Sequence, residues 1–470
     1  MRKFIKNLLF AFGAQSIAMI SSILISLVMP KILGVETFAY WQLFIFYSGY
    51  VIFFHFGLLD GLYLRYGGIR LADMNKRLIG SQIRFMSLWQ IVISIILLCI
   101  LPFFIHDEMR MYVWIMVCIY LVILNMMTGL SYMFQAGNET HLYSIANMIS
   151  KVLFIVFILV SILIRNNNIK SFLVMYLTAH IASVAFCVYH GREFIFSKWI
   201  DFKTLIAETY QNMKIGINMT LSVIASSLIL GFGRGFVDQH WNLKSFGVFS
   251  LAISLTNFGL MFIAQISMVM FPALRQAGSE KQLSIYSLLR GSIGILICGA
   301  LVFYVPIKTV LMLWLPDYAD SFSYLGILFP ICVFDGKMQM LYNTYLKVFR
   351  KERVLLLINI VSCLFSLLLC LFSTYVLDSI VAVVYSMIIA IAVRSVIASC
   401  YLSKSMNISY EKNIIYEVIL CAVFVLANQL STPGVAFLIY FGFYILVVFM
   451  CRKDFMNVYM TLKNYSGNRK

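Results

Sequence analysis

The stretch FHFGLLDGLYLRYGG, residues 54–68, ends an apolar run that begins near residue 39. About 20 mostly apolar residues are enough for a helix to cross the hydrocarbon of a membrane. A helix is the element expected there, because lipid offers the backbone no hydrogen-bond partners. The stretch therefore predicts a membrane-spanning helix that carries an acid, Asp60, and a base, Arg65, near one end.

The whole chain has the composition of a membrane protein. Hydrophobic residues make up 62% and charged residues 12%, and the mean hydropathy is +0.92. Soluble domains have about 45–50% apolar and 25% charged residues. Transmembrane β-strands would show short alternating segments between turns, and the sequence lacks this pattern. The predicted fold class is an all-α polytopic membrane protein.

Fourteen stretches of the chain are long and apolar enough to be transmembrane helices. The first seven cover about residues 8–30, 39–63, 79–102, 111–135, 143–164, 171–190 and 213–237. The second seven cover about residues 246–271, 285–306, 323–348, 354–376, 378–402, 413–430 and 433–451.

The basic residues are unevenly distributed over the loops. With the N-terminus on the cytoplasmic side, 26 of the 36 Lys and Arg residues fall on that side and 7 on the other. The remaining three lie inside spans. Cytoplasmic loops carry such an excess, so we expect both chain ends to be cytoplasmic. A basic surface of this kind is attracted to anionic membrane lipids. No basic run is interleaved with a soluble module, so nucleic acid is not an expected partner.

A weak internal repeat divides the chain. KNLLFAFGAQSIAMISSILIS (6–26) matches KIGINMTLSVIASSLILGFGR (214–234) in order and pattern, as ETFAYWQLFIFYSGY (36–50) matches KSFGVFSLAISLTNF (244–258). The offset of 208 residues contains six spans, which predicts two parallel six-helix lobes. We expect lobes at 1–196 and 213–403, joined by a cytoplasmic interfacial helix at 197–212. Residues 404–470 would add two extra helices and a cytoplasmic tail.

The opening of the chain resembles a known family. A basic amphipathic start and a Ser/Gly-rich first span precede PKILGVETFAYWQLF (30–44) and FGLLDGLYLRYGG (56–68). These features are similar to the opening of Wzx-type flippases. Those proteins export O-antigen and other polysaccharide repeat units, and they belong to the multidrug/oligosaccharidyl-lipid/polysaccharide exporter superfamily. The span count, the two lobes and the length extend the resemblance over essentially the whole chain.

The resemblance implies a transport function and no enzyme activity. It implies that the protein flips an undecaprenyl-diphosphate-linked oligosaccharide from the inner to the outer leaflet of the bacterial cytoplasmic membrane. Alternating access between the lobes would drive this step in O-antigen, capsule or exopolysaccharide synthesis. Expected partners are this lipid-linked oligosaccharide, H⁺ or Na⁺ as coupling ion, and a polysaccharide polymerase with its chain-length regulator. No cofactor or metal is expected.

Several charged residues lie inside the predicted spans. Each costs roughly 2.5–3.5 kcal/mol there, so it needs a partner or a wet cavity. Lys151, Lys337 and Arg394 are the deepest bases, and Asp335 is the one acid placed at similar depth. Cations in a water-filled cavity suit a diphosphate. We expect the substrate to bind in a cationic cavity lined by Lys151, Lys337, Arg394 and Arg290. The alternative is that these bases form buried structural pairs or extend to the lipid headgroups.

Residues 54–68 supply a second set of candidate functional residues. Gly57 and Gly61 form a G-x-x-x-G pattern, which predicts close packing on a neighbouring helix. Arg65 at the membrane boundary would partly neutralise Asp60. This pair is either an anchor at a helix end or a gate that binds an ion. We expect ion coupling or gating to involve Asp335, Asp60, Arg65 and His55.

Two other functions stay open. An ion-coupled multidrug or cation antiporter of the same superfamily would share the fold, but a cavity with more bases than acids suits an anionic substrate better. A membrane polysaccharide polymerase or ligase would need a sizeable extracellular loop. The longest predicted outer connection, about 307–322, has only 16 residues.

Overall fold

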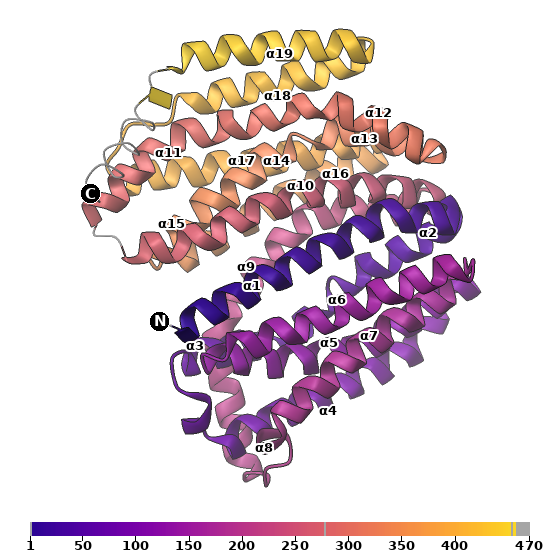
Figure 1. Cartoon of the computed structure of the whole chain (residues 1–470), viewed down its shortest axis with the longest axis vertical. Helices are drawn as coiled ribbons and strands as arrows, with labels where there is room; N and C mark the ends of the chain where they lie inside the picture. Colours follow the sequence, from indigo (N-terminus) through magenta and orange to yellow (C-terminus); the bar gives the residue numbers. More distant parts are fainter. Residues whose placement is uncertain (1, 277–278, 453–454, 457–470) are drawn as a thin grey trace. The chain divides into compact units, whose positions relative to one another are not determined.

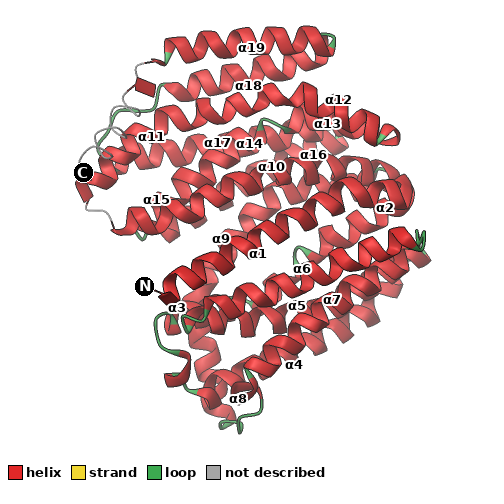
Figure 2. Ribbon diagram, viewed as in Figure 1, coloured by secondary structure: helices red, strands yellow, loops and turns green. Residues whose placement is uncertain are grey.

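The structure, a computed structural model, describes residues 2–276, 279–452 and 455–456. Every regular element among them is helical (Figure 2), which confirms the predicted all-α fold class. The chain forms two compact units, residues 1–224 and 225–470.

The first unit contains eight α-helices and the first part of a ninth (Figure 1). They are α1 (Arg2–Ile23), α2 (Met29–Ser48), α3 (Leu58–Tyr66), α4 (Lys76–Ile100), α5 (Glu108–Ala136), α6 (Thr140–Leu163), α7 (Ile169–His190), α8 (Arg192–Ile195) and α9 (Phe202–His240). A π-helical turn, Leu24–Val28, joins α1 to α2, and 3-10 turns occupy Val51–His55, Leu71–Asp73 and Leu101–Phe103.

The second unit contains the rest of α9 and the helices that follow it. They are α10 (Leu243–Gln276), α11 (Ser279–Ala300), α12 (Tyr304–Trp314), α13 (Ala319–Leu328), α14 (Ile331–Lys337), α15 (Asn343–Val348), α16 (Glu352–Tyr375), α17 (Ile380–Ser405), α18 (Asn413–Leu430) and α19 (Pro433–Met450). The π-helical turn η7 (Met338–Tyr342) joins α14 to α15, and 3-10 turns occupy Leu301–Phe303 and Pro316–Tyr318.

The number of spans differs from the predicted fourteen. Within the described residues, twelve helical stretches are long and apolar enough to cross a membrane, and one bent pair makes a thirteenth. Most of the first two predicted spans lies in a single stretch, Phe10–His55, which Gly34 interrupts with a φ of 73°. The tenth predicted span is the bent pair, Pro316–Leu328 and Ile331–Val348, whose two parts meet at 47°.

Polar caps explain where several of these helices begin. The side chains of Asn75, Asp107 and Asn168 each accept a hydrogen bond from a backbone N–H in the first turn of α4, α5 and α7. Ser379 does the same for α17. Each cap satisfies one of the N–H groups that a helix start leaves without a partner. The short polar loops of the sequence therefore fix the ends of the long apolar helices.

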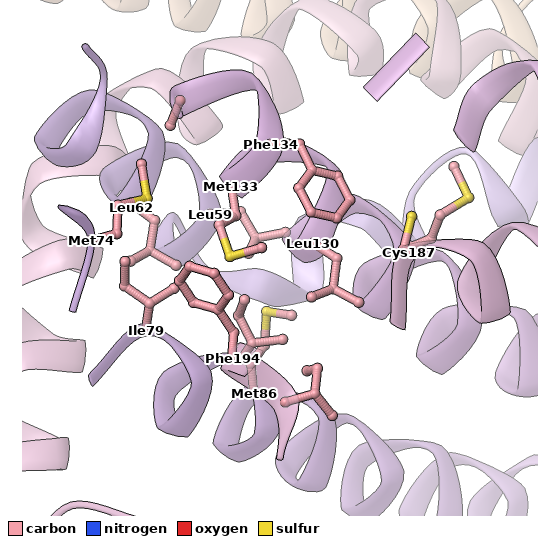
Figure 3. Close-up of a cluster of buried hydrophobic side chains, with 14 of the residues drawn as sticks. Leu59, Leu62, Met74, Ile79, Met86, Leu130, Met133, Phe134, Cys187 and Phe194 are labelled. Atoms are coloured by element: carbon pink, nitrogen blue, oxygen red, sulfur yellow. The ribbon is translucent and has the colours of Figure 1, made fainter. Parts of the chain in front are cut away.

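In the first unit α5 is the central helix, because it packs against α2, α3, α4, α6 and α7. Apolar side chains fill the region where α3, α4 and α5 meet α7 and α8 (Figure 3). Their buried members include Leu59, Leu62, Ile79, Met86, Leu130, Met133, Phe134, Cys187 and Phe194. This cluster holds α3, the short helix that carries Asp60 and Arg65, against the long helices.

In the second unit α17 packs against α13, α14 and α16, and α10 packs against α13 and α14. The apolar cluster at one end of these helices includes Tyr286 of α11, Tyr342 of η7 and Tyr345 of α15, all fully buried. α18 packs against α11 and α19. The broken segment from α13 to α15 is thus enclosed by neighbouring helices within its unit.

α9 is unusually long for a membrane helix. Its 39 residues extend about 58 Å at 1.5 Å per residue, roughly twice the hydrocarbon thickness of a bilayer. The predicted interfacial helix at 197–212 corresponds in part to its first turns, which continue without a break into the span. That these turns lie at the cytoplasmic surface stays a prediction, as do the lobe boundaries and the 208-residue repeat.

The predicted topology can be tested at two exposed positions. In a cysteine-free background, we expect Asp317→Cys to react with an impermeant thiol reagent added to intact cells, because the loop bias places it outside. Lys351→Cys should react only after permeabilisation. Both side chains are exposed in the structure. Labelling in the opposite order would contradict the topology.

Candidate functional site

The predicted membrane helix that ends within residues 54–68 is broken in the structure. α2 ends at Ser48 and a 3-10 turn follows it. Phe56 (φ 50°) and Gly57 (φ 85°) then adopt left-handed conformations before α3 begins at Leu58. Glycine tolerates this geometry and phenylalanine does not favour it. Discontinuous membrane helices of this kind often form substrate and ion sites.

Neighbouring helices satisfy the backbone at this break. The side-chain amide of Asn125 on α5 donates a hydrogen bond to the carbonyl oxygen of Val51 at 2.8 Å. The indole N–H of Trp89 on α4 donates to the carbonyl oxygen of Phe54 at 3.2 Å. Irregular backbone inside a membrane requires such partners. The break is therefore stabilised by the packing of the first unit.

Asp60 lies in the first turn of α3 and is 8% exposed. Its carboxylate accepts a hydrogen bond from the Thr220 hydroxyl of α9 at 2.5 Å. Nearby, His55 is buried, and its Nδ1 accepts a hydrogen bond from the backbone N–H of Gly57 at 3.0 Å. A neutral His55 ring consequently carries its proton on Nε2. The structure brings these two titratable groups to the same break, where they interact electrostatically.

The predicted neutralisation of Asp60 by Arg65 is wrong. Arg65 instead donates hydrogen bonds to Glu208 at 2.5 Å and to Asn212 at 3.3 Å, both on α9. Residues five apart on a helix point about 140° apart around its axis, so Asp60 and Arg65 face different neighbours. The hydrogen bond to Glu208 raises the pKa of Arg65 above its ordinary value.

The predicted close packing of Gly57 and Gly61 is confirmed. A Cβ on Gly61 would overlap the carbonyl group of Asn212, and one on Gly57 would lie 2.7 Å from the backbone nitrogen of Ile217. On the other side, a Cβ on Gly216 would overlap the backbone of Gly57 and Gly61. α3 and α9 therefore meet backbone to backbone, as small residues permit.

Lys151 is a half-buried base on α6, which packs against α1, α5 and α7. It makes no hydrogen bond or ion pair with any residue that the structure describes. Its ammonium group interacts electrostatically with the buried His180 on α7. Of the predicted substrate-binding bases, Lys151 thus keeps its charge available for a ligand.

In the second unit, the broken span α13–α15 carries the predicted site residues. Asp335 and Lys337 lie on α14, between the bend and the π-helical turn η7. Single π-helical turns inside membrane and soluble helices occur frequently at functional sites. The irregular geometry therefore coincides with the charged residues.

Asp335 forms an ion pair with Arg394 of α17. Arg394 is 2% exposed and also donates a hydrogen bond to the Ser226 hydroxyl at 2.7 Å. The other oxygen of Asp335 accepts a hydrogen bond from Gln339 at 2.8 Å. The structure thus brings together two predicted site residues whose charges neutralise each other.

Lys337 is fully buried and forms two ion pairs. Its ammonium group donates to Glu411 and to Glu417, the latter at 2.6 Å. Neither partner is among the site residues predicted from the sequence, in which Asp335 is the one acid expected at this depth. Glu417 could have been found, because it is an acid inside the predicted span 413–430. Glu411 lies in the connection between α17 and α18, where nothing in the sequence marks it as buried.

Arg290 lies on α11 and is half-buried. Its guanidinium group donates hydrogen bonds to the backbone carbonyl of Ser409 at 2.6 Å and to the hydroxyl of the same residue at 3.4 Å. Asn413 donates to the carbonyl of Gly291 at 2.8 Å. Together these contacts hold the α17–α18 connection on α11, so Arg290 has a structural partner, and its role in substrate binding stays a prediction.

Comparison with known proteins identifies the family. The family model for polysaccharide biosynthesis proteins matches residues 4–278, more than half of the chain. The chain belongs to this family. In this polysaccharide biosynthesis protein, the matched range contains the α2–α3 break, Asp60 and Lys151, while the Asp335–Arg394 and Lys337 clusters lie beyond it.

Solved structures share the fold of this polysaccharide biosynthesis protein. The lipid II flippase MurJ, in an inward closed conformation, aligns with a TM-score of 0.70 at 13% identity, covering 97% of this chain and 100% of the other. A multidrug resistance MATE family transporter of the MOP superfamily, in an inward-facing conformation, aligns with a TM-score of 0.62 at 13% identity, covering 91% and 99%.

A MOP superfamily transporter from Pyrococcus furiosus aligns with a TM-score of 0.56 at 12% identity, covering 86% of this chain and 95% of the other. None of the curated protein sequences matches this chain. The structural likenesses establish that this polysaccharide biosynthesis protein has the fold of the MOP superfamily transporters.

Proposed function

We propose that this protein flips an undecaprenyl-diphosphate-linked oligosaccharide from the inner to the outer leaflet of the bacterial cytoplasmic membrane. The observation that carries the proposal is the fold shared with a lipid II flippase along 97% of a chain of the polysaccharide biosynthesis family. O-antigen, capsule and exopolysaccharide precursors are the glycans that this function would serve. A polymerase and its chain-length regulator would then act on the exported product.

The chemistry of the substrate favours Lys151 as a contact to its diphosphate. A diphosphate loses hydration on crossing the membrane, and a cation at the crossing point replaces part of it. Lys151 is half-buried and has no partner among the described residues. Lys337 and Arg394 already face carboxylates, so their binding to substrate requires these pairs to open. Arg290 would need to release Ser409.

The α2–α3 break is the proposed gate. Asp60 and His55 are buried titratable groups at a discontinuous helix, and Arg65 holds α3 to α9 through Glu208. Uptake of H⁺ or Na⁺ at Asp60 would change the charge beside the left-handed residues Phe56 and Gly57. Such a change would alter the orientation of α3, which is the element that these contacts hold in place.

A cation antiporter is the second candidate function. The likeness to a multidrug transporter and the acid content of the second unit favour it. Within the described residues of that unit, Asp335, Glu411 and Glu417 surround only Lys337 and Arg394. The expectation that deep bases outnumber deep acids therefore does not hold there, and the argument for an anionic substrate rests on Lys151.

Reconstituted vesicles provide the test of flipping. We expect the purified protein to move a fluorescent undecaprenyl-diphosphate-linked oligosaccharide to the opposite leaflet, where an impermeant lectin binds it. Lys151→Ala should lower the initial rate at least roughly tenfold, because a hydrogen bond to a charged group contributes about 1.5–3 kcal/mol. Lys151→Arg, which keeps the charge, is the matched control and should retain most of the rate.

Two results would overturn these assignments. Equal rates for wild type and Lys151→Ala would remove Lys151 from the substrate site. Transport of organic cations, with no movement of the lipid-linked oligosaccharide, would replace the flippase by the antiporter.

A further inference from the structure

Three charged side chains form a buried cluster in the second unit with one acid in excess. Lys337 of α14 is paired with Glu411 and Glu417, and the side chains of Lys337 and Glu417 are both 0% exposed. Two ionised carboxylates and one ammonium group would leave a net charge of −1. An uncompensated buried charge is far more costly than a buried neutral acid. The cluster therefore favours one additional proton.

The hydrogen bonds identify which carboxylate is ionised. Glu411 accepts from Lys337 on one oxygen. Its other oxygen accepts from the hydroxyls of Tyr342 and Ser399, each at 3.1 Å. Three donors satisfy an ionised carboxylate well. Glu411 is consequently the ionised member.

Glu417 has a different environment. Its Oε1 accepts from Lys337, but its Oε2 is buried and has no hydrogen-bond partner among the described residues. Gly294 of α11 packs directly on this carboxyl group, since a Cβ there would overlap both oxygens. No donor stabilises a negative charge on Oε2, so the proton belongs on Glu417.

The other titratable groups around the cluster do not remove the excess charge. Tyr286 and Cys298 of α11 and Tyr342 of η7 interact with it electrostatically, and all three are neutral when protonated. Arg290 of α11 is the nearby cation outside the cluster. It binds Ser409 and forms no ion pair with either carboxylate among the described residues.

We infer that the Lys337–Glu411–Glu417 cluster is a proton-binding site, in which Glu417 holds a proton that exchanges during the transport cycle. The connection between α17 and α18 covers the site, and Arg290 and Asn413 anchor this connection to α11. Displacement of the connection would admit water to Glu411 and Glu417. Loss of the proton would then leave two negative charges beside a single lysine, so that Glu411 of the connection and Glu417 of α18 would repel each other.

The link between this proton and transport rests on the proposed function, but proton binding itself does not. Lys337 is the last residue of α14, immediately before the π-helical turn η7. A change of one charge at Lys337 therefore acts at the irregular part of the broken span. Lys337 belongs to the second unit, and the proposed Asp60 gate belongs to the first.

Infrared difference spectroscopy of the purified full-length protein tests the proton directly. We expect wild type to show the carbonyl stretch of a protonated carboxylic acid that disappears as the pH is raised. The band should be absent from both Glu417→Gln and Glu411→Gln, because either change leaves one acid paired with Lys337. Asp378→Asn is the control and should retain the band, since Asp378 is an exposed acid that pairs with His240 and not with Lys337.

A wild-type spectrum without this band, or a band that survives in Glu417→Gln, would overturn the proton site. Glutamine keeps the shape of the side chain, and gel filtration of the variant confirms its fold.

The role in transport has a separate readout. In vesicles, an imposed pH gradient should change the flipping rate of wild type and leave that of Glu417→Gln unchanged. If the gradient changes both rates equally, the proton on Glu417 is not coupled to transport. If neither protein moves the lipid-linked oligosaccharide but the infrared band behaves as expected, the proposed function fails and the proton site stands.

Discussion

Replacing Asp335 by leucine should destabilise the protein by about 3–5 kcal/mol, because the change leaves the buried guanidinium of Arg394 without its counter-charge. Arg394 is 2% exposed and its other hydrogen bond goes only to the neutral Ser226. The free energy of unfolding in detergent micelles, or the melting temperature if unfolding is irreversible, measures the loss.

The double variant Asp335→Leu/Arg394→Met shows whether the loss of stability comes from the unpaired charge of Arg394 or from the loss of the ion pair itself. Replacing a buried ion pair by apolar residues of similar volume is often nearly neutral. We therefore expect the double variant to be more stable than the single one. If the two are equally destabilised, the contact contributes by packing and the charges do not depend on each other.

Gly61→Ala should also be strongly destabilising. A single methyl group would overlap the carbonyl of Asn212, and relieving this overlap requires α3 and α9 to separate. Overpacking of this kind costs about 1–3 kcal/mol, and occasionally more. The intrinsic helix preference of alanine, about 1 kcal/mol better than glycine, acts in the opposite direction. A lower melting temperature and a lower yield of monodisperse protein should show that the overlap dominates.

Gly442→Ala is the matched control for this change. Gly442 lies in α19, and a Cβ there would have nothing within 4 Å. It should leave the melting temperature unchanged or raise it slightly. Equal losses at positions 61 and 442 would contradict the close contact between α3 and α9.

Most of the fold could be predicted because a membrane helix can be recognised from its own stretch of sequence. A run of about 20 apolar residues is sufficient to predict a span, whatever its neighbours are. The break before α3 was harder to predict. Phe56 adopts a left-handed conformation that its residue type does not favour. The backbone of this break is held by Asn125 and Trp89, which lie far away in the sequence.

The site could be predicted only as a set of residues. The cost of charge in lipid marked Asp335, Lys337 and Arg394, and this argument depends on each residue alone. Their partners depend on tertiary structure. Arg65, for example, pairs with Glu208, 143 positions away in the sequence, and not with Asp60. Glu411, in a connection between helices, could be assigned to Lys337 only after folding.

The contact of α3 with α9 has a consequence for genetic repair. A side chain at position 61 meets the main chain of Asn212, and one at position 216 meets the main chain of Gly57 and Gly61. Every amino acid has the same main chain, so no substitution at these opposing positions can restore the lost space. Second-site suppressors of a Gly61 or Gly216 mutation should therefore map elsewhere, to residues that let α3 shift as a rigid body. The apolar side chains of Leu59 and Leu62, and the residues packed against them, are where such suppressors should be found.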